Sequence, residues 1–122
     1  MWPPEYRHFI DCHQLVKAEL EIPEANDLSG VGASFELLDE DGASSESNDF
    51  YPGLIVKADG YVPIGGCLIG SGDPYFINIR DQQPGPVYRI YHDSVFDEDY
   101  DRNQAIARVL DSFEQLLQYR RS

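Results

Sequence analysis

The sequence predicts an α+β fold in which helices pack on a mostly antiparallel sheet. Several segments in the middle of the chain alternate apolar and polar residues with a period of two, which is typical of a half-buried strand. Segments near both ends instead space their apolar residues three and four apart, as an amphipathic helix does. No internal repeat or linker divides the 122 residues, so we expect a single domain over residues 1–122.

The first 23 residues predict a helix and then a strand. Pro3 and Pro4 suit a helix start, where a missing N–H costs nothing, and helical spacing of apolar residues continues over residues 4–13. Residues 16–22 then alternate apolar and charged side chains, which predicts a strand with one buried face. Pro23 is expected to end that strand.

Residues 24–53 have the least regular pattern. The apolar run 35–38 fits either a strand or one helical turn. The stretch DEDGASSESND at 39–49 is polar and small, and we interpret it as a solvated loop. The acidic residues of this stretch are candidates for a recognition loop: Asp39, Glu40, Asp41, Glu46 and Asp49.

The next segments predict a meander of antiparallel strands. LIVKA and YVPI flank Asp59-Gly60, which favours a hairpin with a two-residue turn. YFINIR predicts a strand with Tyr75, Ile77 and Ile79 on one face, and VYRIYH predicts another after a turn at DQQPGP.

The end of the chain predicts an amphipathic helix. Helical spacing relates the apolar residues Ile106, Val109, Leu110, Phe113, Leu116 and Leu117. Asp99 or Asp101 is expected to cap the start of this helix, and Arg120 and Arg121 suit its C-terminal end.

The glycine-rich stretch LIGSGDPYFINI at 68–79 suggests either a phosphate cradle or a bend between strands. A phosphate-binding loop would need a lysine where Ser71 stands, and a helix after it, whereas YFINI predicts a strand. We therefore interpret Gly70 and Gly72 as residues that let the backbone bend, with Asp73 in the turn and Tyr75 opening the next strand.

Metal binding and catalysis find little support in the residue pattern. Asp97, Asp99 and Asp101 have the first ligand spacings of an EF-hand, but Arg102 replaces its glycine and Arg108 its bidentate glutamate. The three histidines show no zinc-site spacing with the cysteines, and no nucleophile, base and orienting group can be named together. We expect a protein that is not an enzyme and has no metal and no cofactor.

Charge is the most informative bulk property. Nine Lys and Arg against 22 Asp and Glu leave a net charge of −13, which disfavours nucleic acid and anionic membranes as partners and favours a basic protein. No apolar run approaches the roughly 20 residues that a bilayer span needs, and the N-terminus lacks a secretory signal pattern. We expect a cytoplasmic protein whose Cys12 and Cys67 remain thiols. Tyr51, Tyr61 and Tyr100 lie beside acidic residues, as they do in many protein-binding surfaces.

The order of several motifs resembles the SUKH superfamily of Smi/Knr-like proteins. WPPEYRHF at 2–9 is similar to the "LP-x-x-Y-x-x-F" helix start of that family, and VPIG at 62–65, GSGD at 70–73 and YFIN at 75–78 resemble its central signature. Val87-Tyr88 with His92-Asp93 resembles the next strand, and SFEQLL at 112–117 resembles the terminal helix. The chain departs from the family pattern at Asn78, where an acidic residue is usual, and it starts almost at the first motif.

The resemblance implies helices on a mostly antiparallel sheet and a bacterial immunity protein that neutralises a secreted polymorphic toxin, often a nuclease. The family also contains non-enzymatic interaction scaffolds and regulators without a toxin partner, and this alternative stays open. We expect the acidic surface to contact a basic toxin domain. The candidate contact residues are Asp39, Glu40, Asp41, Glu46 and Asp49, with a second group at Asp97, Glu98, Asp99 and Asp101.

Overall fold

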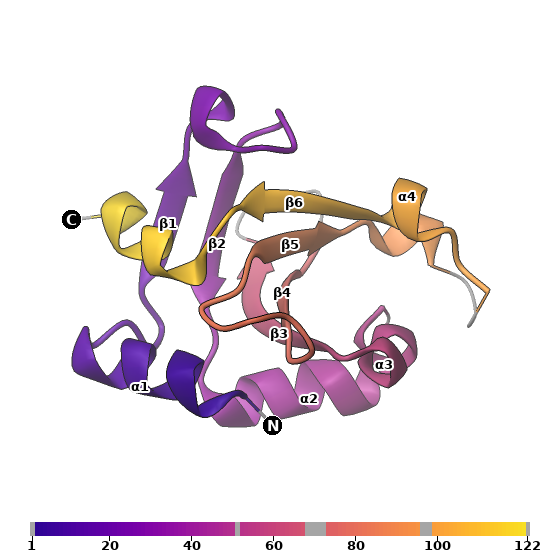
Figure 1. Cartoon of the computed structure of the whole chain (residues 1–122), viewed down its shortest axis with the longest axis horizontal. Helices are drawn as coiled ribbons and strands as arrows, with labels where there is room; N and C mark the ends of the chain where they lie inside the picture. Colours follow the sequence, from indigo (N-terminus) through magenta and orange to yellow (C-terminus); the bar gives the residue numbers. More distant parts are fainter. Residues whose placement is uncertain (1, 51, 68–72, 96–98, 122) are drawn as a thin grey trace.

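The computed structural model describes residues 2–50, 52–67, 73–95 and 99–121. Its sheet has six strands in the order in which they follow along the chain, and each neighbouring pair is antiparallel (Figure 1). The strands are β1 (Glu19–Ile22), β2 (Ala33–Leu37), β3 (Tyr61–Cys67), β4 (Tyr75–Asn78), β5 (Val87–Ile90) and β6 (Ile106–Leu110). The predicted α+β class and the antiparallel meander are therefore confirmed.

Helices accompany this sheet on both faces. The α-helices are α1 (Pro4–Cys12), α2 (Glu40–Asp49), α3 (Gly53–Val56) and α4 (Arg102–Ala105), and the 3₁₀ helices are η1 (Glu24–Asn26), η2 (Lys57–Asp59), η3 (His92–Ser94) and η4 (Phe113–Tyr119). In Figure 1, α1 and α2 lie below the strands, α3 follows the end of α2, and α4 precedes β6. The sheet curls, so that β1 and β2 run across the direction of β5 and β6 in this view.

The main core lies between α1, η4 and one face of the sheet. Its aromatic part joins Trp2, Tyr6, Phe9 and Phe113 through ring centroids 5.0 to 5.4 Å apart. Trp2 also donates from Nε1 to the carbonyl of Pro63 at 2.9 Å, which ties the N-terminus to β3. The WPPEYRHF motif thus forms the predicted helix and anchors it to the sheet.

A smaller core covers the opposite face of the sheet. Among the described residues, five are buried in it, and Ile55, Tyr61, Tyr100 and Ile106 pack against them. The buried residues are Val56, Phe76, Ile90, Val95 and Ala105. Apolar residues from α3 and α4 therefore give the sheet a second, thinner layer.

The expectation of a solvated loop at 39–49 is wrong, because these residues form α2. The Asp39 carboxylate accepts from the N–H of Gly42 at 2.7 Å, which caps the helix, and Glu40 and Asp41 suit its positive N-terminal end. Only Ala43 and Ser47 of α2 are buried. A helix that buries two small residues leaves almost no apolar periodicity in the sequence, so its pattern resembles that of a loop.

The predicted hairpin at 54–64 is half wrong. YVPI lies in β3 as expected, but LIVKA forms α3 and the start of η2. Gly60 does have a positive φ of 95°, and it ends η2 by donating to the carbonyl of Lys57 rather than forming a two-residue turn. A short apolar run fits a strand and a buried helical turn equally well.

The predicted helix over 106–117 is also wrong. Residues 106–110 form β6, paired with β5, and residues 113–119 form η4. Ser112 separates them: its hydroxyl accepts from the N–H of Glu114, and the Gln115 side chain accepts from the N–H of Ser112, which completes a capping box. The apolar residues of β6 and η4 together happen to lie three and four positions apart, which is the spacing of one amphipathic helix.

The remaining elements follow the sequence with small changes. Helix 4–13 is confirmed as α1, the open choice at 35–38 is resolved as β2, and β4 and β5 occur where expected. The first strand begins at Glu19 instead of residue 16, because Lys17 has a φ of 63° that breaks an extended segment. Ile79 lies beyond the end of β4 and is exposed rather than on the buried face.

Candidate protein-interaction surface

The solvent-facing side of α2 carries acidic residues that the sequence predicted as contacts, Asp41 and Asp49. Four exposed residues form one stripe along the helix: Asp41, Ser45, Asn48 and Asp49. Ala43 and Ser47 point the opposite way into the protein, where α2 packs on β3 and α3. The buried small residues thus fix which acidic side chains face outward.

Two of the five predicted acids on this segment have cationic partners within the chain. Asp39 caps the helix and lies 3.8 Å from the ammonium of Lys17. Glu40 accepts two hydrogen bonds from Arg7, at 3.0 Å from Nε and 2.6 Å from Nη2. The hydrogen bond from Arg7 lowers the pKa of Glu40, so this carboxylate keeps its charge. Asp39 and Glu40 therefore attach α2 to the rest of the protein.

The C-terminal half of α2 has a different environment. Burial raises the pKa of the half-buried Glu46 carboxyl, whereas Asp49 is exposed and accepts from the hydroxyl of Ser45 at 3.3 Å. The last turn of α2 contains no basic residue, so the negative end of its dipole adds to the charge of Asp49. Phe50, directly after the helix, is 55% exposed. An exposed aromatic ring beside acidic groups suits contact with an arginine or lysine of a partner.

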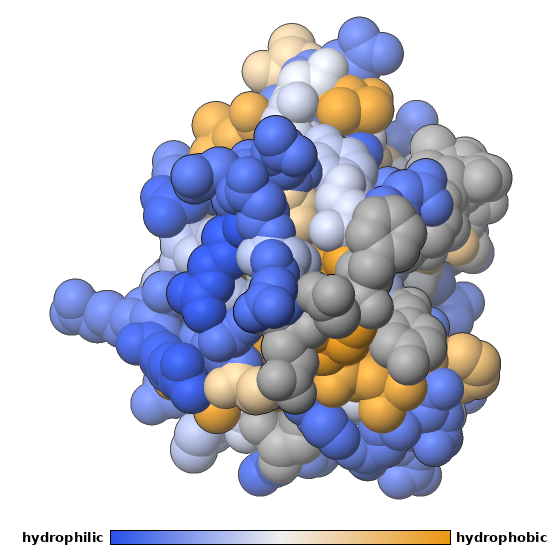
Figure 2. All heavy atoms as spheres, turned by 90° about the vertical axis from the view of Figure 1, so that its right-hand side faces the viewer, coloured by the Kyte–Doolittle hydropathy of each residue, from blue (hydrophilic) through white to orange (hydrophobic). Residues whose placement is uncertain are grey.

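Figure 2 looks onto the end of the molecule toward which α2 runs in Figure 1. It shows apolar atoms in more than one area of this face, one of them low in the view and bordered in part by hydrophilic atoms. Leu54 and Ile55 of α3 are half-buried. Apolar groups bordered by polar ones are common in protein interfaces.

The second predicted acidic group is only partly described. Asp97 and Glu98 lie outside the described residues. Asp99 is exposed, and Asp101 accepts from the N–H of Asn103 at 2.9 Å to cap α4. The predicted choice between Asp99 and Asp101 as a cap is resolved in favour of Asp101, although the helix that it caps is only Arg102–Ala105.

The structure also describes only two of the four residues that were predicted to shape the glycine-rich stretch at 68–79. Gly70 and Gly72 lie outside the described residues, as does Tyr51. Asp73 and Tyr75 are both buried, and Tyr75 opens β4 as predicted. Its ring stacks on Phe35 with centroids 4.1 Å apart, so Tyr75 belongs to the core.

Two of the tyrosines expected at an exposed surface, Tyr61 and Tyr100, are half-buried and make contacts within the protein. Tyr61 packs edge-on against Tyr88 at 5.4 Å, and Tyr88 donates to Asp81 at 2.8 Å. Tyr100 donates to Asp59, which also pairs with Arg102 at 2.6 Å. These contacts hold the second layer on the sheet and leave α2 as the better interaction candidate.

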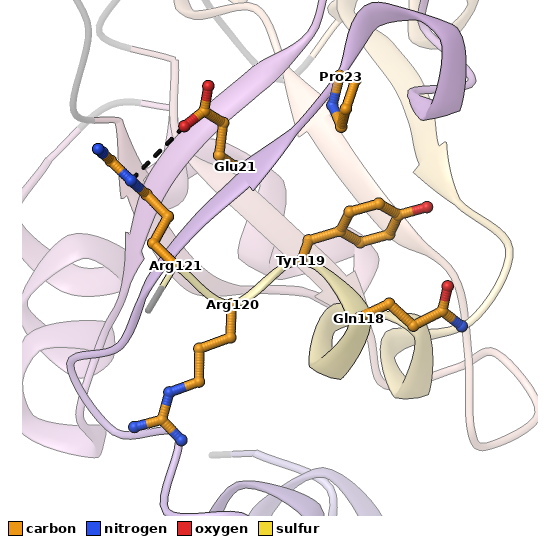
Figure 3. Close-up of a pocket in the computed structure, with 6 residues that line it drawn as sticks. All are labelled: Glu21, Pro23, Gln118, Tyr119, Arg120 and Arg121. Atoms are coloured by element: carbon orange, nitrogen blue, oxygen red, sulfur yellow. Dashed lines mark ion pairs between the residues drawn. The ribbon is translucent and has the colours of Figure 1, made fainter.

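A cavity of about 450 Å³ lies where the end of the chain meets β1 (Figure 3). Leu20 and Arg120 form a β-bridge there, and Arg121 donates from its backbone to Glu19 at 2.9 Å. Figure 3 shows Arg121 turned toward Glu21, with 3.5 Å between Nε and Oε2. Arg121 therefore pairs with Glu21 across the edge of the sheet, and Arg120 donates to the carbonyl of His13 at 3.4 Å, so these charged groups do not converge on the cavity.

A histidine and a cysteine come together on α1, a contact that the sequence pattern did not predict. His8 and Cys12 lie four residues apart on α1, and Cys12 Sγ is 3.3 Å from His8 Nε2. The i, i+4 spacing can be read from the sequence, but it matches no zinc-site motif, so the sequence pattern did not predict this contact. Within residues 2–50, 52–67, 73–95 and 99–121, no group of three or more His, Cys, Asp or Glu side chains is arranged to hold a metal ion. Cys12 and Cys67 are not joined by a disulfide, in agreement with the expectation of thiols.

Among the described residues, every helix is too short or too polar to span a lipid bilayer.

Comparisons with protein families, with curated proteins and with solved structures give no significant match to this chain.

Proposed function

We propose that this chain is an immunity protein of the SUKH type, which acts in the cytoplasm by binding a basic toxin domain and blocking it. The observation that carries the proposal is the outward acidic face of α2 on a protein of net charge −13. A nuclease is the toxin class that fits best, because its substrate groove is basic where it grips phosphate. An acidic helix laid into that groove competes with the nucleic acid for the same cations.

The contact in this proposal centres on the C-terminal half of α2. Asp41 and Asp49 supply the outward charge, and Phe50 supplies an apolar anchor next to them. Interfaces concentrate their binding energy in such central aromatic residues, while surrounding charges mainly accelerate association. Asp39 and Glu40 contribute indirectly, since their partners Lys17 and Arg7 hold the helix in place.

The first experiment tests the biological role. The chain is co-expressed with the toxin-like reading frame that neighbours its gene, and growth is scored before the complex is isolated. Rescue of growth together with a stable complex supports the proposal. A complex without rescue contradicts toxin neutralisation and favours the non-enzymatic scaffold alternative.

The second experiment tests the surface. We expect Asp41→Asn with Asp49→Asn to slow association about tenfold at low salt and to weaken its salt dependence. Phe50→Ala is expected to accelerate dissociation. The matched control is Asp11→Asn with Glu114→Gln, which removes the same charge at exposed positions on α1 and η4 and leaves association within about twofold.

A second charge-removal variant covers the other acidic group. Asp97, Glu98, Asp99 and Asp101 are changed to their amides, which preserves the cap at Asp101 because asparagine also caps helices. If neither this variant nor the α2 variant differs from the control, the electrostatic basis of the proposal is wrong.

A further inference from the structure

The outer side of α1 forms one wall of a groove that is separate from the acidic face of α2. Glu5, His8 and Cys12 are spaced three and four residues apart, so they form one stripe along the helix, and all three are exposed. Arg7, which holds Glu40 of α2, projects from the other side of α1, because each residue turns an α-helix by about 100°. A ligand in this groove therefore has no need of the α2 surface.

Aromatic rings and a proline give the groove an apolar floor. Phe9 and Phe113 pack with ring centroids 5.4 Å apart, and the His13 ring lies 5.0 Å from Phe9. Pro84, from the loop between β4 and β5, lines the groove as well. The groove has a volume of about 430 Å³, and pockets that bind small ligands have roughly 300–1,000 Å³. Carbon surface of this extent favours a ligand with an apolar part.

Two carboxylates add negative charge beside this floor. Glu5 comes from the first turn of α1 and Glu114 from the first turn of η4, and both line the groove. Among the residues that the structure describes, neither carboxylate forms an ion pair with a lysine or arginine, and no lysine or arginine lines the groove. The groove therefore matches a ligand with an apolar body and a cationic end.

An arginine side chain has this combination. Its carbon stem packs on apolar surface while its charged head stays in water, and its planar guanidinium stacks on rings and donates two hydrogen bonds to one carboxylate. We propose that the groove between α1 and η4 binds an arginine side chain from an exposed segment of a second protein partner, distinct from the one that α2 contacts. The stem lies on Phe9, and the guanidinium pairs with Glu5 and Glu114.

The test uses a short capped peptide with one arginine between glycines, added at low salt to the isotope-labelled full chain. Amide chemical shifts report both the site and the affinity. A single side chain contributes little binding energy, so we expect a dissociation constant of about 1 mM, with the shifts centred on α1 and η4.

Two matched peptides separate charge from shape. Citrulline keeps the shape of arginine without its charge, and it is expected to bind about fivefold more weakly because it forms no ion pair. Lysine keeps the charge without the planar head, and it is expected to bind about threefold more weakly. Equal binding of the arginine and citrulline peptides overturns the proposal, and so does tighter binding of the lysine peptide.

Two double variants locate the charge that the peptide meets. Glu5→Gln with Glu114→Gln should weaken binding of the arginine peptide about fivefold, because both ion pairs are lost. Asp41→Asn with Asp49→Asn removes the same charge from α2 and should keep the affinity within about twofold. All four residues are exposed, so the variants are expected to fold, and their amide spectra check this. Equal losses in the two variants would mean that the peptide binds the net charge of the protein, which overturns the proposal. The absence of shifts on α1 and η4 at millimolar peptide also overturns it.

Discussion

Arg89 and Asp27 form an ion pair inside the protein, with 3.4 Å between Nη2 and Oδ2 and side chains only 4% and 0% exposed. The same Arg89 nitrogen donates to the carbonyl of Gly32 and to the hydroxyl of Tyr75, and its guanidinium lies 5.3 Å from the centre of the Tyr75 ring. Asp27 accepts from the N–H and the hydroxyl of Ser29 at 2.7 and 2.6 Å. The pair therefore attaches the loop between β1 and β2 to β5, which lies four strands from β1 in the sheet.

Asp27→Ala is expected to lower the free energy of unfolding by about 3–5 kcal/mol, because it leaves a buried guanidinium without its counter-ion. Urea unfolding measures the change. Asp27→Ala combined with Arg89→Met should cost less than Asp27→Ala alone, since the double variant buries no unpaired charge.

The exposed pair Arg108–Asp111 is the control for this prediction. Its atoms are also 3.4 Å apart, but its side chains are 51% and 67% exposed. Arg108→Met should change stability by less than about 1 kcal/mol, because water screens the pair. Equal losses at Asp27 and Arg108 would contradict the role assigned to burial.

Asp39→Ala is expected to destabilise the protein by about 1 kcal/mol and to lower its helix content, because α2 loses the cap on the N–H of Gly42. Asp41→Ala removes an equal charge two residues later without removing a cap, so it should lower the free energy of unfolding by only about 0.3 kcal/mol. Far-ultraviolet circular dichroism and urea unfolding separate the two variants. If Asp41→Ala proves the more harmful, the capping role of Asp39 is wrong.

High pH is expected to destabilise the protein through its buried and half-buried tyrosines. Burial, followed by the hydrogen bond to Asp81, raises the pKa of Tyr88 to about 12, and burial raises the pKa of Tyr75 to about 12 as well. Burial also raises the pKa values of Tyr6 and Tyr100. An unfolded tyrosine loses its proton near pH 10, so between about pH 10 and 12 the unfolded state binds fewer protons than the folded state. The stabilisation is complete below pH 10 and is lost as the pH rises toward 12.

Urea unfolding at a series of pH values, with tyrosinate absorbance followed in parallel, measures this loss. Tyr88→Phe should show a shallower decline above pH 10 than the wild-type chain, because one raised pKa has been removed. Identical declines in the two proteins would show that Tyr88 does not contribute to it.

The accuracy of the sequence predictions follows how each element is buried. β4 and β5 are rich in β-branched and aromatic residues, so their pattern identifies them directly. α2 owes its helix to the cap at Asp39 and to tertiary contacts of Ala43 and Ser47, and none of these leaves a periodic apolar pattern. In β6, Ile106 and Val109 are β-branched and favour a strand. The apolar residues of β6 and of η4 nevertheless lie three and four positions apart along the sequence, and this spacing predicted one continuous helix where the structure has two separate elements.

The candidate site was predictable in composition but not in geometry. Residue types alone identified the acidic segment at 39–49, but only the fold separates the outward Asp41 and Asp49 from Asp39 and Glu40, which have partners inside the chain. Those partners, Lys17 and Arg7, are more than 20 residues away in sequence, and no local pattern connects them.

Gly65 and Gly66 offer the sharpest test of how β3 packs, because adjacent glycines in one strand face different surroundings. A Cβ on Gly65 would lie 2.6 Å from Cδ2 of Phe35, whose ring is buried and stacked on Tyr75. A Cβ on Gly66 would meet nothing nearer than Cδ2 of Leu38 at 3.8 Å, an ordinary contact.

Gly65→Ala should therefore destabilise the protein by about 1–3 kcal/mol through overpacking. Gly66→Ala should be neutral or stabilising by up to about 1 kcal/mol, because alanine restricts the unfolded chain. Urea unfolding compares the two, and Phe35→Leu should recover part of the loss in Gly65→Ala because it removes the clashing ring. Equal effects at the two positions, or no recovery with Phe35→Leu, would mean that the Phe35 ring does not require a glycine at position 65.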